Sequence, residues 1–156
     1  MSRRNMTTLN DTKNQYLTFQ VGDDVFALEI DKVHEILTYT RITRVPRMPK
    51  FLKGVINLRG HIVPVTDLRH KLGMVPAELT SDTCIVITET AIQEESVIVG
   101  ILTDSVREVI NLEPEQIFLP PKVGIRINPE FIKRIGKHEN LIMILDIDRI
   151  LAFEEI

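Results

Sequence analysis

The stretch PKFLKGVINLRGHIVPVTDL, residues 49–68, decides the fold, because it contains two apolar runs on either side of a glycine. Glycine readily adopts the positive φ angle that the first position of a two-residue hairpin loop requires. We therefore predict a turn at Gly60 and His61, in which Arg59 faces Ile62 across the hairpin. One face of this hairpin is then wholly apolar, and we assign it to the interior of a small barrel. It consists of Leu58, Val63, Ile56 and Val65.

The opposite face of the predicted hairpin carries one cation, Arg59, among mostly apolar neighbours. Its other members are Ile62, Asn57, Pro64, Val55 and Thr66. A planar guanidinium flanked by apolar groups resembles the centre of a partner-binding surface more than a solvated wall. The alternative is that Arg59 is a surface arginine without a function, because most single surface charges have none.

An internal repeat relates the two halves of the chain. FALEIDKVHEIL, from Phe26, aligns with VGILTDSVREVI, from Val99, and PKFLKGV aligns with PEFIKRI. HIVPVTDL, from His61, aligns with NLIMILDI, from Asn140. Each copy has about 70 residues, enough for a barrel of roughly five strands. Many short strands with Gly and Pro turns indicate small barrels or a sandwich, and together with the repeat they lead us to predict a mainly β chain of two small barrels that share an apolar seam, with a few short helices.

Composition sets limits on the function. The chain has 156 residues, 44% of them hydrophobic, and a formal net charge of -3, which argues against a general nucleic-acid binder. Residues 1–14 are polar and unpatterned, so we expect them to be disordered and residues 15–156 to form the folded domain. No apolar run approaches the roughly 18 residues of a membrane span and no signal-peptide pattern opens the chain, so we expect a cytoplasmic protein without membrane insertion.

Taken together, these stretches resemble the CheW-like adaptors of bacterial chemotaxis. The likeness covers about Gln15 to Phe153, and the combination of GVINLRG with IVPVTDL is specific. The resemblance implies two SH3-like five-stranded β-barrels packed around a shared hydrophobic core. It also implies a non-enzymatic adaptor, monomeric in isolation, that couples the cytoplasmic helical tip of a chemoreceptor in membrane arrays to the regulatory domain of a CheA-type histidine kinase. No kinase, receiver or ATP-binding motif occurs in the chain, so the resemblance is to the stand-alone adaptor.

The resemblance also assigns residues by position. A receptor-facing groove would involve Val33, Glu35, Arg59, Ile85 and Val109, with Gly54 and Gly60 needed for backbone shape. Kinase contacts would fall at Ile42 and Arg44 in one barrel and at Lys122 and Val123 in the other. Glu35 is a suitable partner for Arg59, because an ion pair would hold the guanidinium in a fixed orientation. The chain departs from the family pattern at Arg47 and Arg134.

Three alternatives stay open on the sequence. The first is a CheW-like adaptor of a non-flagellar pathway, for twitching or gliding motility, and the second is a nucleic-acid-binding pair of small barrels. The third is an enzyme, for which Asp67 and His70 would share a helical face, but no nucleophile elbow or phosphate loop accompanies them. Because the four histidines lack ligand spacing, we expect no metal and no cofactor. They are His34, His61, His70 and His138.

Overall fold

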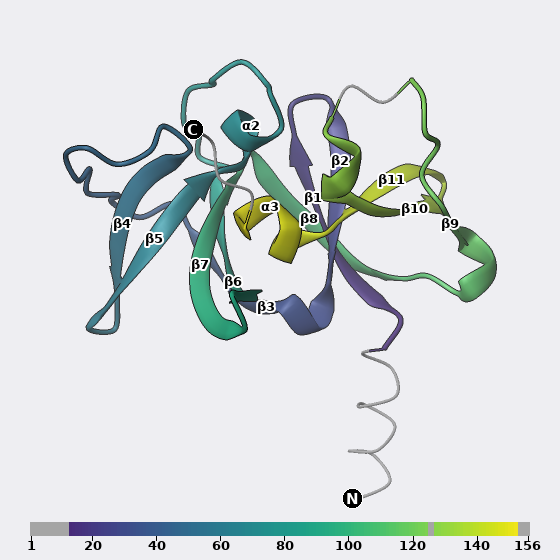
Figure 1. Cartoon of the computed structure of the whole chain (residues 1–156), viewed down its shortest axis with the longest axis horizontal. Helices are drawn as coiled ribbons and strands as arrows, with labels where there is room; N and C mark the ends of the chain where they lie inside the picture. The colour runs from purple at the N-terminus through teal and green to yellow at the C-terminus, as the bar shows by residue number, and fades with distance from the viewer. Residues whose placement is uncertain (1–12, 125–126, 153–156) are drawn as a thin grey trace, which may run out of the picture.

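The structure, a computed structural model, describes residues 13–124 and 127–152. Residues 1–12, most of the segment expected to be disordered, lie outside the described residues. The chain is mainly β, as predicted, and Figure 1 shows its two sheets side by side. Among the described residues, none of the helices has the length and apolar character that crossing a bilayer demands.

The first barrel is a five-stranded sheet in the order β3-β6-β7-β5-β4. Its strands are β3 (Val33–Thr38), β4 (Leu52–Leu58), β5 (His61–Asp67), β6 (Cys84–Ile92) and β7 (Glu95–Thr103). The chain that leaves β3 returns to the opposite edge strand, where Thr43 and Val55 exchange two backbone hydrogen bonds of 2.8 Å. This bridge brings the two edges of the sheet together and closes the barrel.

The second barrel is built in the same way in the order β8-β1-β2-β11-β10-β9. Its strands are β1 (Gln15–Val21), β2 (Asp24–Glu29), β8 (Ser105–Asn111), β9 (Ile117–Phe118), β10 (Ile132–His138) and β11 (Asn140–Leu145). The chain leaving β8 passes through the 3-10 turn η2 (Pro114–Gln116) into β9, which pairs with β10 at Ile135 and Gly136. The two-residue β9 thus takes the place that Thr43 has in the first barrel.

The barrels do not coincide with the two repeats. In the first repeat β1 and β2 belong to the second barrel, whereas β3, β4 and β5 belong to the first. In the second repeat β6 and β7 belong to the first barrel, whereas β8, β10 and β11 belong to the second. We call β1–β2 and β6–β7 the exchanged hairpins. The parallel pairing of β5 with β7 helps to hold the second of them in place, and that of β11 with β2 helps to hold the first. Each barrel therefore needs strands from both repeats, which the sequence comparison did not indicate.

Within the part of the chain that the structure describes, three clusters of buried side chains form the hydrophobic core. One fills the first barrel and consists of Ile56, Val63, Val65, Ile85, Ile87 and Leu102. One fills the second barrel and consists of Tyr16, Ala27, Ile110, Leu112, Ile142 and Ile144. The largest lies between the barrels and includes Phe19, Phe26, Leu28, Leu68, Ile101, Phe131 and Ile147. The shared core that was expected between two barrels is thus confirmed.

The hairpin turn lies one residue earlier than predicted. Leu58 pairs with His61, so the loop is Arg59 and Gly60, with φ angles of 50° and 87°. A two-residue loop with positive φ at both positions favours glycine at the second, and the Gly60 N–H also donates to Asn57 Oδ1 at 2.8 Å. Every cross-strand partner shifts by two residues, and because side chains alternate with period two, the predicted apolar face stays inside. Thr66, however, is 1% exposed and not on the outer face.

Gly54 lies at a β-bulge in β4 where the barrel closes. Its φ is 151°, and a Cβ placed there would lie 2.3 Å from the carbonyl oxygen of Thr43. The second repeat has a bulge at the equivalent place, between Ile132 and Arg134. There a side chain is accommodated, so the departure at Arg134 leaves the repeat's backbone pattern intact.

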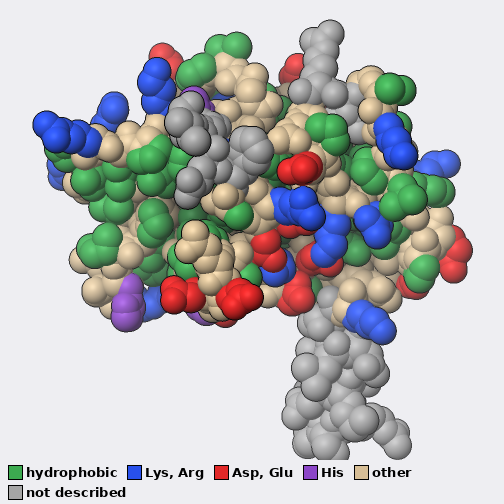
Figure 2. Space-filling model, in the orientation of Figure 1, with side chains coloured by type: hydrophobic (Ala, Val, Ile, Leu, Met, Phe, Trp, Pro, Cys, Tyr) green, Lys and Arg blue, Asp and Glu red, His purple; other side chains and the backbone are tan. Residues whose placement is uncertain are grey.

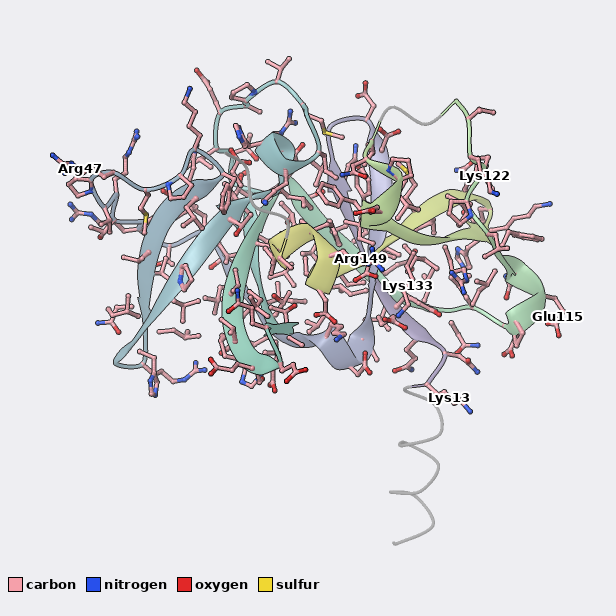
Figure 3. The ribbon with its side chains drawn as sticks, viewed as in Figure 1. Lys13, Arg47, Glu115, Lys122, Lys133 and Arg149 are labelled. Carbon is pink, nitrogen blue, oxygen red and sulfur yellow. The ribbon has the colours of Figure 1, made fainter. Side chains whose placement is uncertain are left out.

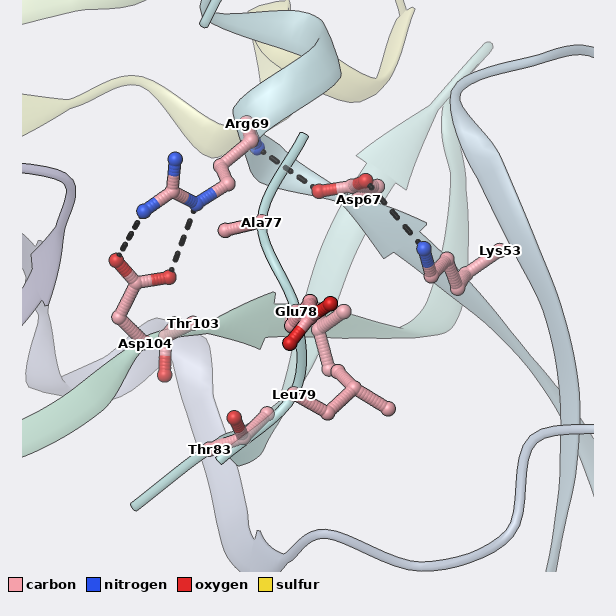
Figure 4. Close-up of a pocket in the computed structure, with 10 residues that line it drawn as sticks. Lys53, Asp67, Arg69, Ala77, Glu78, Leu79, Thr83, Thr103 and Asp104 are labelled. Atoms are coloured by element: carbon pink, nitrogen blue, oxygen red, sulfur yellow. Dashed lines mark hydrogen bonds and ion pairs between the residues drawn. The ribbon is translucent and has the colours of Figure 1, made fainter. Parts of the chain in front are cut away.

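Two polar clasps join the barrels at equivalent places in the repeat. Figure 4 shows the first: the guanidinium of Arg69, in α2 (Leu68–Lys71), donates to Asp104 from Nε at 3.1 Å and from Nη2 at 2.6 Å. The Asp104 carboxylate also accepts the Gly22 N–H at 2.8 Å. Burial raises the pKa of the Asp104 carboxyl, but the bonds from Arg69 and Gly22 outweigh it and hold the pKa below its usual range.

The second clasp is centred on Asp148 in α3 (Ile147–Ala152). Its carboxylate accepts from the Thr90 hydroxyl and from the Ala91 N–H at 3.1 Å, and it lies 3.0 Å from Lys32 Nζ. Lys32 belongs to η1 (Ile30–Lys32), the turn that connects the two barrels. Burial raises the pKa of Asp148, and the bonds from Thr90, Lys32 and Ala91 more than offset it, so this pKa is also lowered. Both clasps therefore favour ionised carboxylates in the folded state.

We predict that Gly54→Ala destabilises the protein by at least about 2 kcal/mol, because the new methyl group meets a backbone oxygen that cannot move without opening the barrel. Melting should occur roughly 4 to 8 °C lower, measured by circular dichroism. The matched control is Gly73→Ala, at φ 74° with nothing within 4 Å of the new Cβ, which should cost only about 1 kcal/mol. Equal losses in the two variants would contradict the closure argument.

The clasps predict a loss of stability in acid. Because the folded pKa values of Asp104 and Asp148 are lowered, their contribution is present above the unfolded pKa of about 4 and is lost as the pH falls through the folded pKa. The double variant Asp104→Asn with Asp148→Asn should lose roughly 1 kcal/mol per site at neutral pH, allowing for carboxylates that are 35% exposed. Urea unfolding should show a flatter decline below pH 4 than in wild type or Asp82→Asn. If the stability of the double variant and that of wild type decline equally steeply below pH 4, the clasps are not the cause of the loss of stability in acid.

Candidate functional site

Arg59, at the tip of the β4–β5 hairpin, forms an ion pair with Glu35 on β3. The guanidinium Nη1 lies 3.3 Å from Oε2 of Glu35, and Nη2 contacts Oε1. The Arg59 side chain is 67% exposed and that of Glu35 is 28% exposed. The hydrogen bond from Arg59 lowers the pKa of Glu35, and the same bond raises the pKa of Arg59. The guanidinium is therefore oriented by one carboxylate while most of its surface faces solvent.

This ion pair spans the seam of the first barrel. β3 and β4 are the two edges of the sheet, and among the described residues the seam has backbone hydrogen bonds only between Thr43, in the chain that leaves β3, and Val55 of β4. At the other end of the seam the contact is between side chains, Glu35 with Arg59. The charge thus lies in the turn itself and not, as predicted, on the outer strand face opposite Ile62.

A mostly apolar hollow opens beside Arg59. β5 and β7 pair only from Val65 to Asp67 and diverge toward the hairpin tips. The hollow between them is lined by Leu58, Arg59, Ile62, Val63, Pro64 and Ile98, with His34, His61, Ser96 and Val97 at its rim. Ile62 is 67% exposed at this place. An arginine held at the edge of an apolar surface offers a directed hydrogen bond within a hydrophobic contact.

The structure separates the other residues that the resemblance placed in the groove. Val33 is half-buried on the same strand as Glu35 and packs against the shared core. Val109 is 48% exposed, but it lies on β8 in the other barrel. Ile85 is fully buried inside the first barrel, because the alternation of β6 points it inward, so it offers no surface to a partner. Within this set, Glu35 and Arg59 form an ion pair.

The loops predicted to meet the kinase lie at opposite ends of the molecule. Figure 3 places Arg47, close to Arg44 in the chain, at one end and Lys122 toward the other. Ile42 is half-buried against the first-barrel core, whereas Arg44 is exposed. Val123 is 82% exposed. Sequence reasoning missed two further exposed apolar residues here, Phe118 at 49% and Leu119 at 73%, which the following pair of prolines could have indicated.

The residues behind the enzyme alternative line one open hollow on the first barrel. Its lining includes Asp67, His70 and Lys53 but no Ser, Thr or Cys. The Asp67 carboxylate accepts the Arg69 N–H at 3.1 Å, as the N-cap of α2, and lies 4.0 Å from Lys53 Nζ. Asp67 thus has a structural role in capping. Among the described residues, no group of three His, Cys, Asp or Glu side chains is placed to hold a metal ion.

Comparisons with known proteins agree on one family. Residues 15–155 match the family model described as the CheW-like domain. The chemotaxis protein CheW of Klebsiella aerogenes is 33% identical over 142 residues, covering 90% of this chain and 83% of that protein. Protein FrzA of Myxococcus xanthus is 30% identical over 112 residues, covering 72% of this chain and 67% of that protein. The crystal structure of the scaffolding protein TtCheW from Thermoanaerobacter tengcongensis aligns with a TM-score of 0.80 and 29% identity, over 91% of this chain and 90% of that one.

We predict that Arg59→Ala hardly changes the melting temperature, because an exposed ion pair contributes little to stability and the turn backbone depends on Gly60. The reversed pair, Glu35→Arg with Arg59→Glu, should melt like wild type at low and high salt. Calorimetry checks both variants. A large drop for Arg59→Ala that the reversed pair restores would show instead that the ion pair is needed to hold the barrel closed.

Proposed function

The chain belongs to the CheW-like family of chemotaxis scaffold proteins, and from this we propose that it couples the cytoplasmic helical tips of chemoreceptors to the regulatory domain of a CheA-type histidine kinase. It acts without catalysing a reaction, in the cytosol at membrane receptor arrays, and is a monomer in isolation. The observation that carries this proposal is the oriented Arg59 guanidinium at the edge of an apolar hollow. Such a surface is suited to binding a partner protein and not to catalysing the transfer of a chemical group.

The receptor surface is the part of the first barrel around Arg59. A helical tip presents a stripe of apolar side chains with polar groups beside it. Ile62 and Pro64 supply apolar area, and Arg59 supplies a hydrogen-bond donor whose direction Glu35 fixes. Val33 and Val109 are proposed to extend this surface toward the second barrel.

The kinase surfaces are the loops at the two ends of the molecule. Ile42 and Arg44 form the contact on the first barrel, and Lys122 and Val123 form the contact on the second. Because these loops lie at opposite ends, one adaptor can bind two kinase regulatory domains at once. Val123 is the strongest apolar candidate, since at 82% exposure its side chain has little contact with its own barrel.

A second candidate is the same adaptor role in a non-flagellar pathway, for twitching or gliding motility. One relative of this chain, protein FrzA, has a name other than CheW. This similarity supports the second candidate. The two candidates share the fold and the surfaces and differ in the receptors and kinase that are bound. Genetic deletion followed by assays of swimming and of surface motility separates them.

The proposed function predicts two separable defects in a mixture of adaptor, receptor and kinase. Arg59→Ala should weaken receptor binding about 30-fold, the cost of losing a central interface side chain, and leave kinase binding intact. Lys122→Glu with Val123→Ala should weaken kinase binding and leave receptor binding intact. Titration calorimetry measures each affinity, and phosphorylation measures activation, which both variants should impair.

Lys137→Glu, an exposed cation of β10 outside both surfaces, is the matched control and should behave like wild type. Equal loss of both affinities in either variant would contradict the separation of the surfaces. If wild type fails to raise kinase activity with receptors present, the adaptor role itself is wrong.

A further inference from the structure

The charges of this chain are unevenly distributed. From residue 36 to residue 66 the sequence contains six of the 19 basic residues and none of the 22 acidic ones. Arg59 and Lys53 are paired with Glu35 and Asp67, the acids that flank this stretch. The other four cations are exposed, and within the described residues none of them has a carboxylate within ion-pair distance. They are Arg41, Arg44, Arg47 and Lys50, which we name the cationic loop.

The cationic loop borders hollows in the surface. One hollow is lined by Arg44, Arg47 and Lys50 together with apolar Val45, Pro46 and Met48. A second, on the other side of Arg44 and Lys50, includes Tyr39, Ile42 and the paired Asp67. Figure 2 shows blue side chains gathered at this end of the molecule, beside hydrophobic ones. Cations that lie among apolar side chains match a surface that carries both carboxylates and apolar groups.

The backbone of the loop is strained at an arginine. Arg47 has a φ of 67° and follows Pro46, as the third residue of a turn for which glycine is the preferred type. The other non-glycine residues with positive φ in the described chain lie in β-hairpin turns. These are Arg59, Gln93, Glu94 and Glu139. A side chain kept where glycine would relieve the backbone points to a use for that side chain outside the fold.

We propose that the cationic loop is a docking surface for a protein face rich in carboxylates, and that Arg47 is a principal contact. This rests on the proposed function, in which the kinase regulatory domain meets the first barrel near Ile42 and Arg44, and it adds that the facing surface is acidic. Three of the four cations are arginines, whose planar forks bind carboxylates in pairs. Pro46 and Pro49 limit the freedom of the loop, which lowers the entropy that docking costs.

Other anionic partners fit this surface less well. An anionic membrane is typically bound by an amphipathic helix, whereas this segment is a turn with two prolines. Single-stranded nucleic acid is bound by stacking on several exposed rings, whereas the loop itself contains no aromatic residue and Tyr39, just before it, is 40% exposed. A carboxylate-bearing protein surface therefore explains the combination of arginines, prolines and apolar residues.

The first test measures association of the full chain with the kinase regulatory domain as salt is varied. Wild type should associate faster at low salt, and Arg47→Glu should slow association about tenfold and flatten the salt dependence. The matched control, Lys137→Glu, changes the net charge equally but lies on β10, outside both proposed kinase loops, so its rate should stay close to wild type. Equal slowing by both variants would overturn the proposal, because net charge alone would then be the cause.

The second test uses Arg47→Gly, which removes the side chain and relieves the backbone. It should melt at the same or a higher temperature than wild type and still associate more slowly. A lower melting temperature would show that Arg47 serves folding, and wild-type association would show that its side chain makes no contact. Either result overturns the proposal.

The third test separates this proposal from the proposed function. A labelled peptide of alternating glutamate and leucine should bind wild type in a salt-dependent manner and should not bind Arg44→Glu with Arg47→Glu. Peptide binding without kinase binding would sustain the docking surface and refute the adaptor role. Kinase binding that depends neither on salt nor on the two substitutions would sustain the adaptor role and refute the docking surface. If the chain binds phosphatidylglycerol vesicles or single-stranded DNA more tightly than it binds the peptide or the kinase regulatory domain, the choice of partner is overturned.

Discussion

The exchange of hairpins between the two repeats is the constraint on which the rest of the structure depends. β1 and β2 complete the barrel that the second repeat builds, and β6 and β7 complete the barrel that the first repeat builds. Each exchanged hairpin is held by one parallel and one antiparallel pairing, and it contributes buried side chains both to its own barrel and to the core between the barrels. The two clasps then lie where the connections cross from one barrel to the other. The positions of the seam, the hollows and the binding loops follow from this arrangement.

Duplication supplied two similar frames, but only one of them carries the proposed receptor surface. In the first repeat the hairpin has a two-residue loop, in which Arg59 reaches Glu35 across the seam. In the second repeat a single residue, Glu139, separates β10 from β11, and the seam is closed by β9 instead. The difference of one loop residue moves the tip and removes the cation. The frame therefore persists in both copies while the chemistry at the tip does not.

Much of this architecture could be predicted from sequence because it is locally encoded. The apolar inner face of the 52–67 hairpin was predicted correctly even though its turn was misplaced, since a shift of two in pairing leaves the alternation unchanged, whereas Arg59 and Thr66 were wrongly placed on the outer face. The duplication was visible in the aligned aspartates and apolar runs. Which barrel each hairpin joins was not predictable, because strand pairing between distant segments leaves no local pattern. Position in a motif likewise does not tell which face of β6 a residue occupies, and the structure buries Ile85, which the resemblance placed in the groove.

The hairpin exchange also determines how the chain acquires its structure during synthesis. The first barrel runs continuously from β3 to β7 and can close once Thr103 has left the ribosome, whereas the second, which contains β1 and β2, cannot close until β11 has been made. Contacts between distant segments make folding slow, and strand edges stay exposed meanwhile. Once formed, neither barrel can unfold without exposing its side of the core that lies between the two barrels. The molecule is thus expected to unfold as one cooperative unit, and its two ends keep a fixed spacing and angle.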